Sequence, residues 1–363
     1  MAFRRAALLL ALLSILFLAA CGGNDGDGGN GGGGGTISDY LLATDAQLNN
    51  VVVFNLRSDG TIGSSAGGPF FAGSTPSSSA LNTIHGLVYV ANSGSNSIST
   101  FVINDDGSLT KVASDINSGG VNPVSLAISS GGGFLAVLNQ QSFNVQVFSI
   151  DAQTGALDPW ASDATASGEP PVSMTVDPLG TFLYVTTETT VQLFDFDADT
   201  GDISFVETVL NFDPETITAP PLFSPDAFFL YVAGSEGGIY GFTIFDDGSV
   251  EQLDGFPVAA GTTTASMIID SSGTLMYATD STGAVYGFGI APVTGALTSL
   301  PNSPYAASAG AGVMAFDPTE NFLHVAQSGT INSYSIAQNG SLTKLTGQYN
   351  GGNISSMLSY EIQ

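Results

Sequence analysis

An aromatic residue returns at nearly constant intervals along most of this chain, at Phe54, Phe101, Phe148, Phe194, Phe242, Phe288 and Tyr334. The successive spacings are 47, 47, 46, 48, 46 and 46 residues. A Val or Ile stands three residues before each aromatic, and a Leu, Ile or Phe stands two residues after it. Alternation of this kind is typical of a strand with one buried face, and a fixed period of this length indicates a repeat architecture. The chain is therefore expected to repeat one strand-rich unit seven times.

A glycine follows each aromatic within eight residues, and the residue before it is Asp, Thr or Asn. These glycines are Gly60, Gly107, Gly155, Gly201, Gly248, Gly295 and Gly340. A tight hairpin turn requires a positive φ angle, which glycine adopts at little cost. We therefore expect a hairpin after every aromatic strand.

Two further strands precede the aromatic strand in each repeat. One reads "LVYVAN", "FLAVLN" or "FLYVTT", and the other carries Leu or Met at Leu81, Leu126, Met174, Leu222, Met267, Met314 and Met357. With the strand after the turn, this gives four strands per repeat and no helical period. The pattern predicts an all-β, seven-bladed β-propeller with four antiparallel strands in each blade.

The two ends of the repeat region predict how the ring closes. The C-terminal "ISSMLSYEI" (354–362) matches the innermost strands, whereas the N-terminal "YLLAT" (40–44) is a second strand with no innermost strand before it. We expect the last strand to complete the first blade, because an open ring would leave unpaired strand edges.

The first 35 residues are expected to lie outside the propeller of residues 36–363. Arg4 and Arg5 precede an apolar run that ends at Cys21, the pattern of an export signal covering residues 1–20. "LAAC" (18–21) resembles the lipobox of bacterial lipoproteins, which implies cleavage before Cys21 and a lipid on its thiol. Residues 21–35 are a Gly-rich tether. The resemblance places the protein in the bacterial cell envelope, on the periplasmic face or the cell surface, with only the lipid in the membrane.

The charge of the chain limits its partners. Without residues 1–20, Arg57, Lys111 and Lys344 remain against 32 acidic residues, a formal charge of −29. Such a surface repels nucleic-acid phosphates and anionic headgroups. We expect a monomer whose partner is a small molecule or another protein, and no nucleic acid.

Several apparent catalytic motifs are explained by the repeat. Ser108 and Lys111 have the S-x-x-K spacing of some serine hydrolases, but "GSLTK" follows the hairpin turn in two repeats, and a strand places the two side chains on opposite faces. "GSSAG" (63–67) has the G-x-S-x-G spacing without the strand-to-helix turn that a nucleophile elbow needs. His324 stands where other repeats have Tyr, so a buried packing role is expected, and His85 falls in a turn.

The segments "NPVSLAISSGGGFLAVLN" (122–139), "PPVSMTVDPLGTFLYVTT" (170–187) and "VMAFDPTENFLHVAQ" (313–327) resemble the seven-bladed lactonase-type propellers. This family includes the bacterial 6-phosphogluconolactonases, with the YVTN-repeat propellers as neighbours. The resemblance implies an active site of His, Arg and acidic side chains above the central channel. Here no His-Pro-Arg or Asn-Pro-Arg opens an inner strand, so activity on sugar phosphates is not expected.

A ligand site is expected where the loops between second and third strands gather, at one end of the channel. Asp45, Glu188 and Asp280 occupy one register of these loops, and Glu236 lies one position beyond it. Converging carboxylates can hold Ca²⁺, which could polarise a neutral lactone; the alternative is that these acids are ordinary solvated loop residues. Two functions follow: a non-catalytic binding or scaffold module, or a lactonase-type hydrolase of a neutral exported lactone or sugar.

Overall fold

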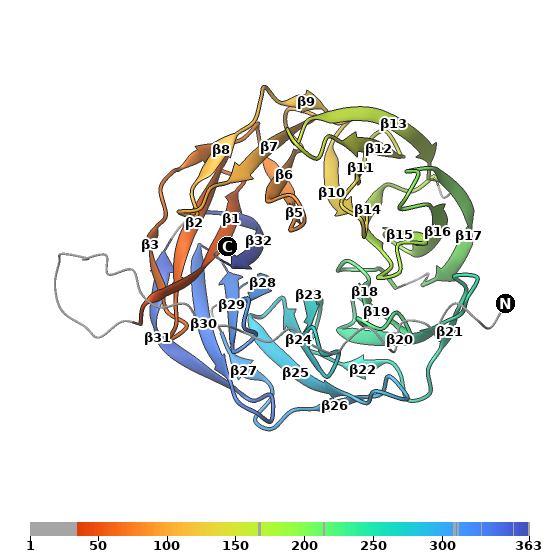
Figure 1. Cartoon of the computed structure of the whole chain (residues 1–363). Coiled ribbons are helices and arrows are strands. Elements are labelled where there is room, and N and C mark those ends of the chain that lie inside the picture. The colour runs from red at the N-terminus through yellow and green to blue at the C-terminus, as the bar shows by residue number, and fades with distance from the viewer. Residues whose placement is uncertain are drawn as a thin grey trace, which may run out of the picture. The chain divides into compact units, whose positions relative to one another are not determined.

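The computed structural model describes residues 35–363, apart from 166–167, 213–214, 308–309, 311, 328, 351 and 362–363. These residues form strands and turns, with no helix among them. The strands make seven antiparallel sheets, the blades, which follow one another around a ring (Figure 1). The prediction of an all-β, seven-bladed propeller is confirmed. None of the described residues forms a helix long and apolar enough to cross a membrane; the predicted signal, Cys21 and most of the tether lie outside them.

Blade 1 joins the two ends of the chain, as the sequence predicts. From the inner edge outward it contains β32 (Ile354–Glu361), β1 (Ile37–Asp45), β2 (Asn50–Arg57) and β3 (Ile62–Ser65), and β4 (Phe70–Phe71) also pairs with β2. The last strand pairs with the first from Asp39 opposite Glu361 to Asp45 opposite Ile354 (Figure 1). This pairing closes the ring and removes the edges that an open ring would expose.

The other six blades use four consecutive strands each, again from the inside outward. Blade 2 contains β5 (Pro76–Asn82), β6 (Leu87–Asn92), β7 (Ser97–Ile103) and β8 (Leu109–Lys111), with β9 (Ile116–Asn117) on β7. Blade 3 contains β10 (Pro123–Ile128), β11 (Phe134–Asn139), β12 (Asn144–Ile150) and β13 (Leu157–Ala164). Blade 4 contains β14 (Pro171–Val176), β15 (Phe182–Thr187), β16 (Thr190–Phe196) and β17 (Ile203–Asn211).

The remaining three blades complete the ring. Blade 5 contains β18 (Leu222–Phe223), β19 (Phe229–Ala233), β20 (Gly238–Ile244) and β21 (Val250–Gln252), with β22 (Val258–Ala259) on β20. Blade 6 contains β23 (Thr264–Ile269), β24 (Leu275–Asp280), β25 (Ala284–Ile290) and β26 (Leu297–Ser299), with β27 (Tyr305–Ala306) on β25. Blade 7 contains β28 (Val313–Phe316), β29 (Phe322–Gln327), β30 (Thr330–Ile336) and β31 (Leu342–Asn350).

The repeated residues have the roles that their spacing predicts. All seven aromatics lie on the third strand of a blade, with at most 3% of their surface exposed. The seven turn glycines all have positive φ angles, between 65° and 81°. A side chain at these positions would be strained, so the glycine is required by the turn itself.

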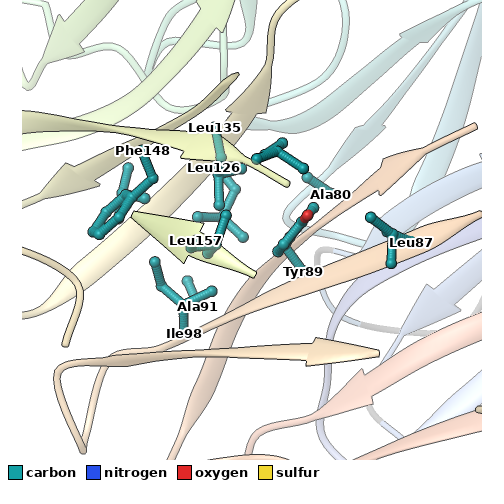
Figure 2. Packing of buried hydrophobic residues seen from close by; sticks show 11 residues of the cluster. Ala80, Leu87, Tyr89, Ala91, Ile98, Leu126, Leu135, Phe148 and Leu157 are labelled. Atoms are coloured by element: carbon teal, nitrogen blue, oxygen red, sulfur yellow. The ribbon is translucent and has the colours of Figure 1, made fainter. Parts of the chain in front are cut away.

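The hydrophobic core lies between neighbouring blades. The cluster between blades 2 and 3 combines Tyr89 and Ile98 of one blade with Leu135, Phe148 and Leu157 of the next (Figure 2). The second strand of each blade is buried on both faces; Leu87–Asn92 is buried at every position. Each blade therefore depends on both neighbours for burial, and the whole ring is needed to shield the apolar surface.

A repeated hydrogen bond also joins successive blades. In five junctions a buried tyrosine hydroxyl donates to the carbonyl of the turn glycine in the next blade, an arrangement we call the tyrosine latch. The pairs are Tyr360–Gly107 (2.8 Å), Tyr89–Gly155 (3.3 Å), Tyr184–Gly248 (2.7 Å), Tyr231–Gly295 (2.8 Å) and Tyr277–Gly340 (2.6 Å). Burial raises the pKa of Tyr360, Tyr89, Tyr231 and Tyr277, so each of these four stays a neutral donor.

The register predicted for the innermost strands is wrong in two blades. In blade 2, Ser79 pairs with Val90 at the position that Leu126 and Met174 occupy in blades 3 and 4, whereas Leu81 lies two residues further on. In blade 5, Leu222 pairs with Tyr231 and is displaced by one position. The two prolines before Leu222 lack a backbone N–H, which shortens this strand to two residues and removes the pairing that would fix its register.

Candidate functional site

The loops between second and third strands lie against the loops that enter the innermost strands, as the topology predicts. Backbone hydrogen bonds join the two sets in several blades: Ala46 N to Asn353 O (3.0 Å), Ser93 N to Thr75 O (2.9 Å), Gln140 N to Asn122 O (2.9 Å), Ile217 N to Glu188 O (2.6 Å) and Ser281 N to Thr263 O (2.9 Å). We call this end of the ring the mouth. It carries all four of the predicted site residues.

The carboxylates of two of those residues, Asp45 and Asp280, accept hydrogen bonds from the turns in which they lie. Asp45 is 3% exposed, and its carboxylate accepts the backbone N–H groups of Gln47 (2.9 Å) and Leu48 (3.0 Å). Asp280 is 1% exposed and accepts the Thr282 hydroxyl (2.7 Å) and the Ala284 N–H (2.9 Å). Burial acts to raise the pKa of Asp280, but these hydrogen bonds outweigh it and lower the pKa. Both carboxylates therefore stabilise turns in the way Asp commonly does.

Glu188 and Glu236 are exposed and belong to neighbouring blades. Their backbones are held in place, because the Glu188 carbonyl accepts the Ile217 N–H and the Glu236 N–H donates to the Glu215 carboxylate (3.1 Å). Among the described residues, no three His, Cys, Asp or Glu side chains lie close enough to hold one metal ion. The four predicted acids are therefore not brought together as a preformed cation site, and calcium binding stays a prediction.

The structure adds Glu169, Glu215 and Tyr240 to the mouth, three residues that sequence analysis missed. The Tyr240 hydroxyl donates to Glu215 Oε2, and burial, then this hydrogen bond, raise the pKa of Tyr240 to about 12. Glu169 Oε2 accepts the hydroxyls of Thr187 (3.0 Å) and Thr189 (2.9 Å). Both glutamates lie on loops that enter innermost strands and vary between blades, so a search by repeat register does not find them. The length of the connection between β17 and β18 is a sequence feature that could have pointed to Glu215.

Two cavities, each about 310 Å³, lie at the opposite end of the ring. One is formed by blades 1, 2 and 7 and includes Tyr40 and Tyr360 in its lining. The other is formed by the innermost strands of blades 6, 7 and 1, near Met314 and Met357. The sequence placed the ligand site at the mouth, and these two cavities are at the other end.

Comparison with known proteins supports the resemblance noted in the sequence. Residues 49–171 match the family model "Lactonase, 7-bladed beta-propeller". The chain has the seven-bladed propeller fold that this family model describes. The periplasmic gluconolactonase of Pseudomonas aeruginosa superposes with a TM-score of 0.76 at 18% identity, covering 90% of this chain and 100% of that one.

Other solved structures have the same fold. A candidate 6-phosphogluconolactonase from Bacteroides uniformis has a TM-score of 0.77 at 17% identity, covering 90% of this chain and 100% of its own. A protein from Lactobacillus plantarum has a TM-score of 0.74 at 17% identity, with the same coverage. Among curated proteins no sequence match was found. At these identities the likeness shows a shared fold.

The positive groups of this propeller lie outside the mouth loops. Arg57 ends β2 at the opposite end, Lys111 and Lys344 lie on outermost strands, and His324 is fully buried. His85 lies in the turn between β5 and β6, also opposite the mouth. These five are the only Lys, Arg and His residues after residue 20. The mouth therefore presents acids, amides and hydroxyls, without the cationic groups expected for an anionic substrate.

The remaining apparent motifs have local roles. The Ser108 hydroxyl bonds to Asp106 (2.5 Å), while the Lys111 ammonium pairs with Asp115 (2.7 Å). The two residues thus have separate partners at the start and end of an outermost strand. This confirms that the S-x-x-K spacing arises from the turn and the strand that follows it. "GSSAG" begins in β3, another outermost strand, so it also has no strand-to-helix elbow.

Proposed function

We propose that this lactonase-type propeller is a non-catalytic binding module that holds a neutral, hydroxyl-bearing small molecule at its mouth. The observation that carries the proposal is the hydrogen bonding of four acids there. The carboxylates of Asp45, Asp280, Glu169 and Glu215 already accept hydrogen bonds from the protein. A general base needs a group free to accept a proton from substrate or water. These four groups instead fix the loops, which is the preorganisation that a binding surface needs.

The charge of the mouth supports a neutral ligand. A phosphate or carboxylate would approach Glu169, Glu188, Glu215 and Glu236 with none of the chain's Lys or Arg residues on the mouth loops. Like charges 4 Å apart repel each other by roughly 1–4 kcal/mol, depending on solvent exposure. Hydroxyl groups can instead donate to glutamate oxygens and accept from Ser, Thr and backbone N–H groups. Neutral sugars and lactones have this chemistry.

The test is calorimetric titration of the full-length protein with neutral sugars and lactones and with their 6-phosphates. We expect a neutral compound to bind, its phosphate to bind at least about ten-fold more weakly, equivalent to ~1.4 kcal/mol, and Glu188→Gln with Glu236→Gln to weaken the neutral compound. Glu251→Gln, an exposed acid on β21 far from the mouth, is the matched control. Tighter binding of the phosphate would contradict the proposal.

Hydrolysis of a neutral lactone is the second candidate, favoured by the fold shared with the P. aeruginosa periplasmic gluconolactonase. Acid release from glucono-1,5-lactone, followed in a pH-stat, separates the two functions. The binding module should leave the spontaneous rate unchanged. Acceleration that is lost in Glu188→Gln or Glu236→Gln, but kept in Glu251→Gln, would establish the hydrolase instead.

The proposal includes anchoring in the bacterial cell envelope through a lipid on Cys21. It is supported by the sequence around that residue, which lies outside the described part of the chain. Labelling with an alkyne fatty acid in a bacterial host should tag the wild-type protein and not Cys21→Ser. Equal labelling of both proteins would contradict the anchor without affecting the ligand proposal.

A further inference from the structure

The junction of blades 1 and 2 contains a cavity of about 310 Å³, at the end of the ring opposite the mouth. Its walls come from three blades: Tyr40, Tyr360 and Glu361 from blade 1, Leu81 and Asp105 from blade 2, and Pro318 from blade 7. This volume is at the lower end of the range for small-molecule sites. The lining is aromatic and aliphatic with a few polar groups, which is the usual composition of a binding pocket.

We propose that this cavity binds a small organic cation, such as a quaternary or primary ammonium group, between its tyrosine rings and its carboxylates. The first support is Tyr40. This side chain lines the cavity and is only 6% exposed, yet no described residue makes a hydrogen bond to its hydroxyl. The neighbouring Tyr360 hydroxyl, in contrast, is bonded to the Gly107 carbonyl. The Tyr40 hydroxyl is therefore available to bond to a group in the cavity, such as an N–H of a primary ammonium or the hydroxyl of choline.

The second support is the pair of aromatic faces. The rings of Tyr40 and Tyr360 are 5.4 Å apart between centroids and inclined by 35°. Cations are attracted to the electron-rich faces of tyrosine rings, more strongly where water is excluded. Both rings are more than nine-tenths buried, so a cation at this wall would be shielded from solvent on one side.

The third support is uncompensated negative charge around the cavity. Glu361 and Asp105 line it, and Asp106 follows directly in the same turn. Asp39, buried beside them on β1, has a raised pKa because of burial and because of repulsion from Asp317 and Glu361. The lining contains no Lys, Arg or His. A bound cation would relieve this repulsion, whereas an anion would increase it.

The probe is choline, compared with 3,3-dimethyl-1-butanol, which has nearly the same shape without the charge. Titration calorimetry and saturation-transfer NMR on the N-methyl protons are carried out on the full-length protein in 150 mM salt, which screens diffuse attraction to the acidic surface. We expect choline to bind and the neutral alcohol to bind at least about ten-fold more weakly, since the charge is the group recognised.

Two variants and one control test the location. Tyr40→Phe keeps the ring and its packing but removes the hydroxyl, and Glu361→Gln removes one exposed charge; each should weaken choline binding by roughly three- to ten-fold. Glu251→Gln makes the same change in net charge on blade 5 and should have no effect. Absence of choline binding, equal binding of the neutral alcohol, or an equal loss in Glu251→Gln would each overturn the proposal. Because this site is at the other end of the ring, its failure leaves the mouth proposal unaffected.

Discussion

His324 should make the stability of this propeller fall with acidity in a way that one substitution removes. The residue stands on β29 at the position that Tyr89, Tyr184, Tyr231 and Tyr277 occupy in other blades. It is fully buried; Nδ1 lies 2.9 Å from the Ser333 hydroxyl, and Nε2 has no hydrogen-bond partner in the described structure. Burial lowers the pKa of His324 from its ordinary value of 6.5 to about 4.

The direction of this pH effect follows from whether the folded or the unfolded chain binds the proton at His324. Between pH 6.5 and about 4 the unfolded chain binds a proton at His324 and the folded chain does not, so acidification favours unfolding in this window. The shift predicts a loss of about 1.4 kcal/mol per pH unit, or roughly 2 kcal/mol between pH 7.5 and pH 5. The 32 acidic residues also contribute to the pH dependence of the unfolding free energy. The contribution of His324 is therefore isolated only by comparing the wild type with a variant.

The comparison uses His324→Tyr, which introduces the residue that the equivalent position carries in four blades. Urea unfolding of both proteins at several pH values from 7.5 to 5 should show the gap between their unfolding free energies widening by about 2 kcal/mol as the pH falls. His85→Gln, which removes the other histidine from a partly exposed turn, should keep the wild-type pH dependence. If wild type and His324→Tyr lose stability in parallel, His324 is not buried in its neutral form and the reasoning is wrong.

Three further predictions follow from the fold. Deleting residues 353–363 should abolish cooperative melting, because it removes the strand that closes blade 1, and a truncated protein with the full melting temperature would contradict ring closure. Tyr231→Phe should lower the unfolding free energy in urea by about 1 kcal/mol through loss of a latch, while Tyr286→Phe, at a position without one, should change it little. Calcium should leave the melting temperature unchanged relative to sodium chloride of equal ionic strength, because no three described acids surround one point; an increase would restore the predicted cation site.

The repeat made most of the fold predictable, because its period is set by packing between blades. The third strand of each blade must place an aromatic in the core, and the hairpin turn that follows it needs a positive φ angle. These residues therefore recur whatever the protein does. The innermost strands were less predictable because one of their edges has no strand partner, and the one in blade 5 has only two residues. Their side-chain pattern is correspondingly weak, and the registers of Leu81 and Leu222 were misjudged for that reason.

The candidate site was harder to predict because one residue type serves two purposes. Asp at the start of a loop can face a ligand or accept the N–H groups of its own turn, and both give the same sequence. Burial distinguishes them: Asp45 and Asp280 are almost fully buried, whereas Glu188 is exposed. Glu215 and Tyr240 escaped notice because their contact joins a loop and a strand 25 residues apart.

The places where the repeat changes are the best guide to function in such a protein, because the repeated residues are already explained by packing. The junction of blades 1 and 2 is one of them. In blade 1 the position of the latch tyrosine is taken by Leu42, and Tyr360 on the innermost strand makes the bond instead. Moving the donor inward places Tyr40 and Tyr360 side by side at the wall of the cavity between blades 1 and 2. The latch to blade 2 uses Tyr360 alone, so the hydroxyl of Tyr40, which has no described hydrogen-bond partner, is left to contact a ligand in the cavity.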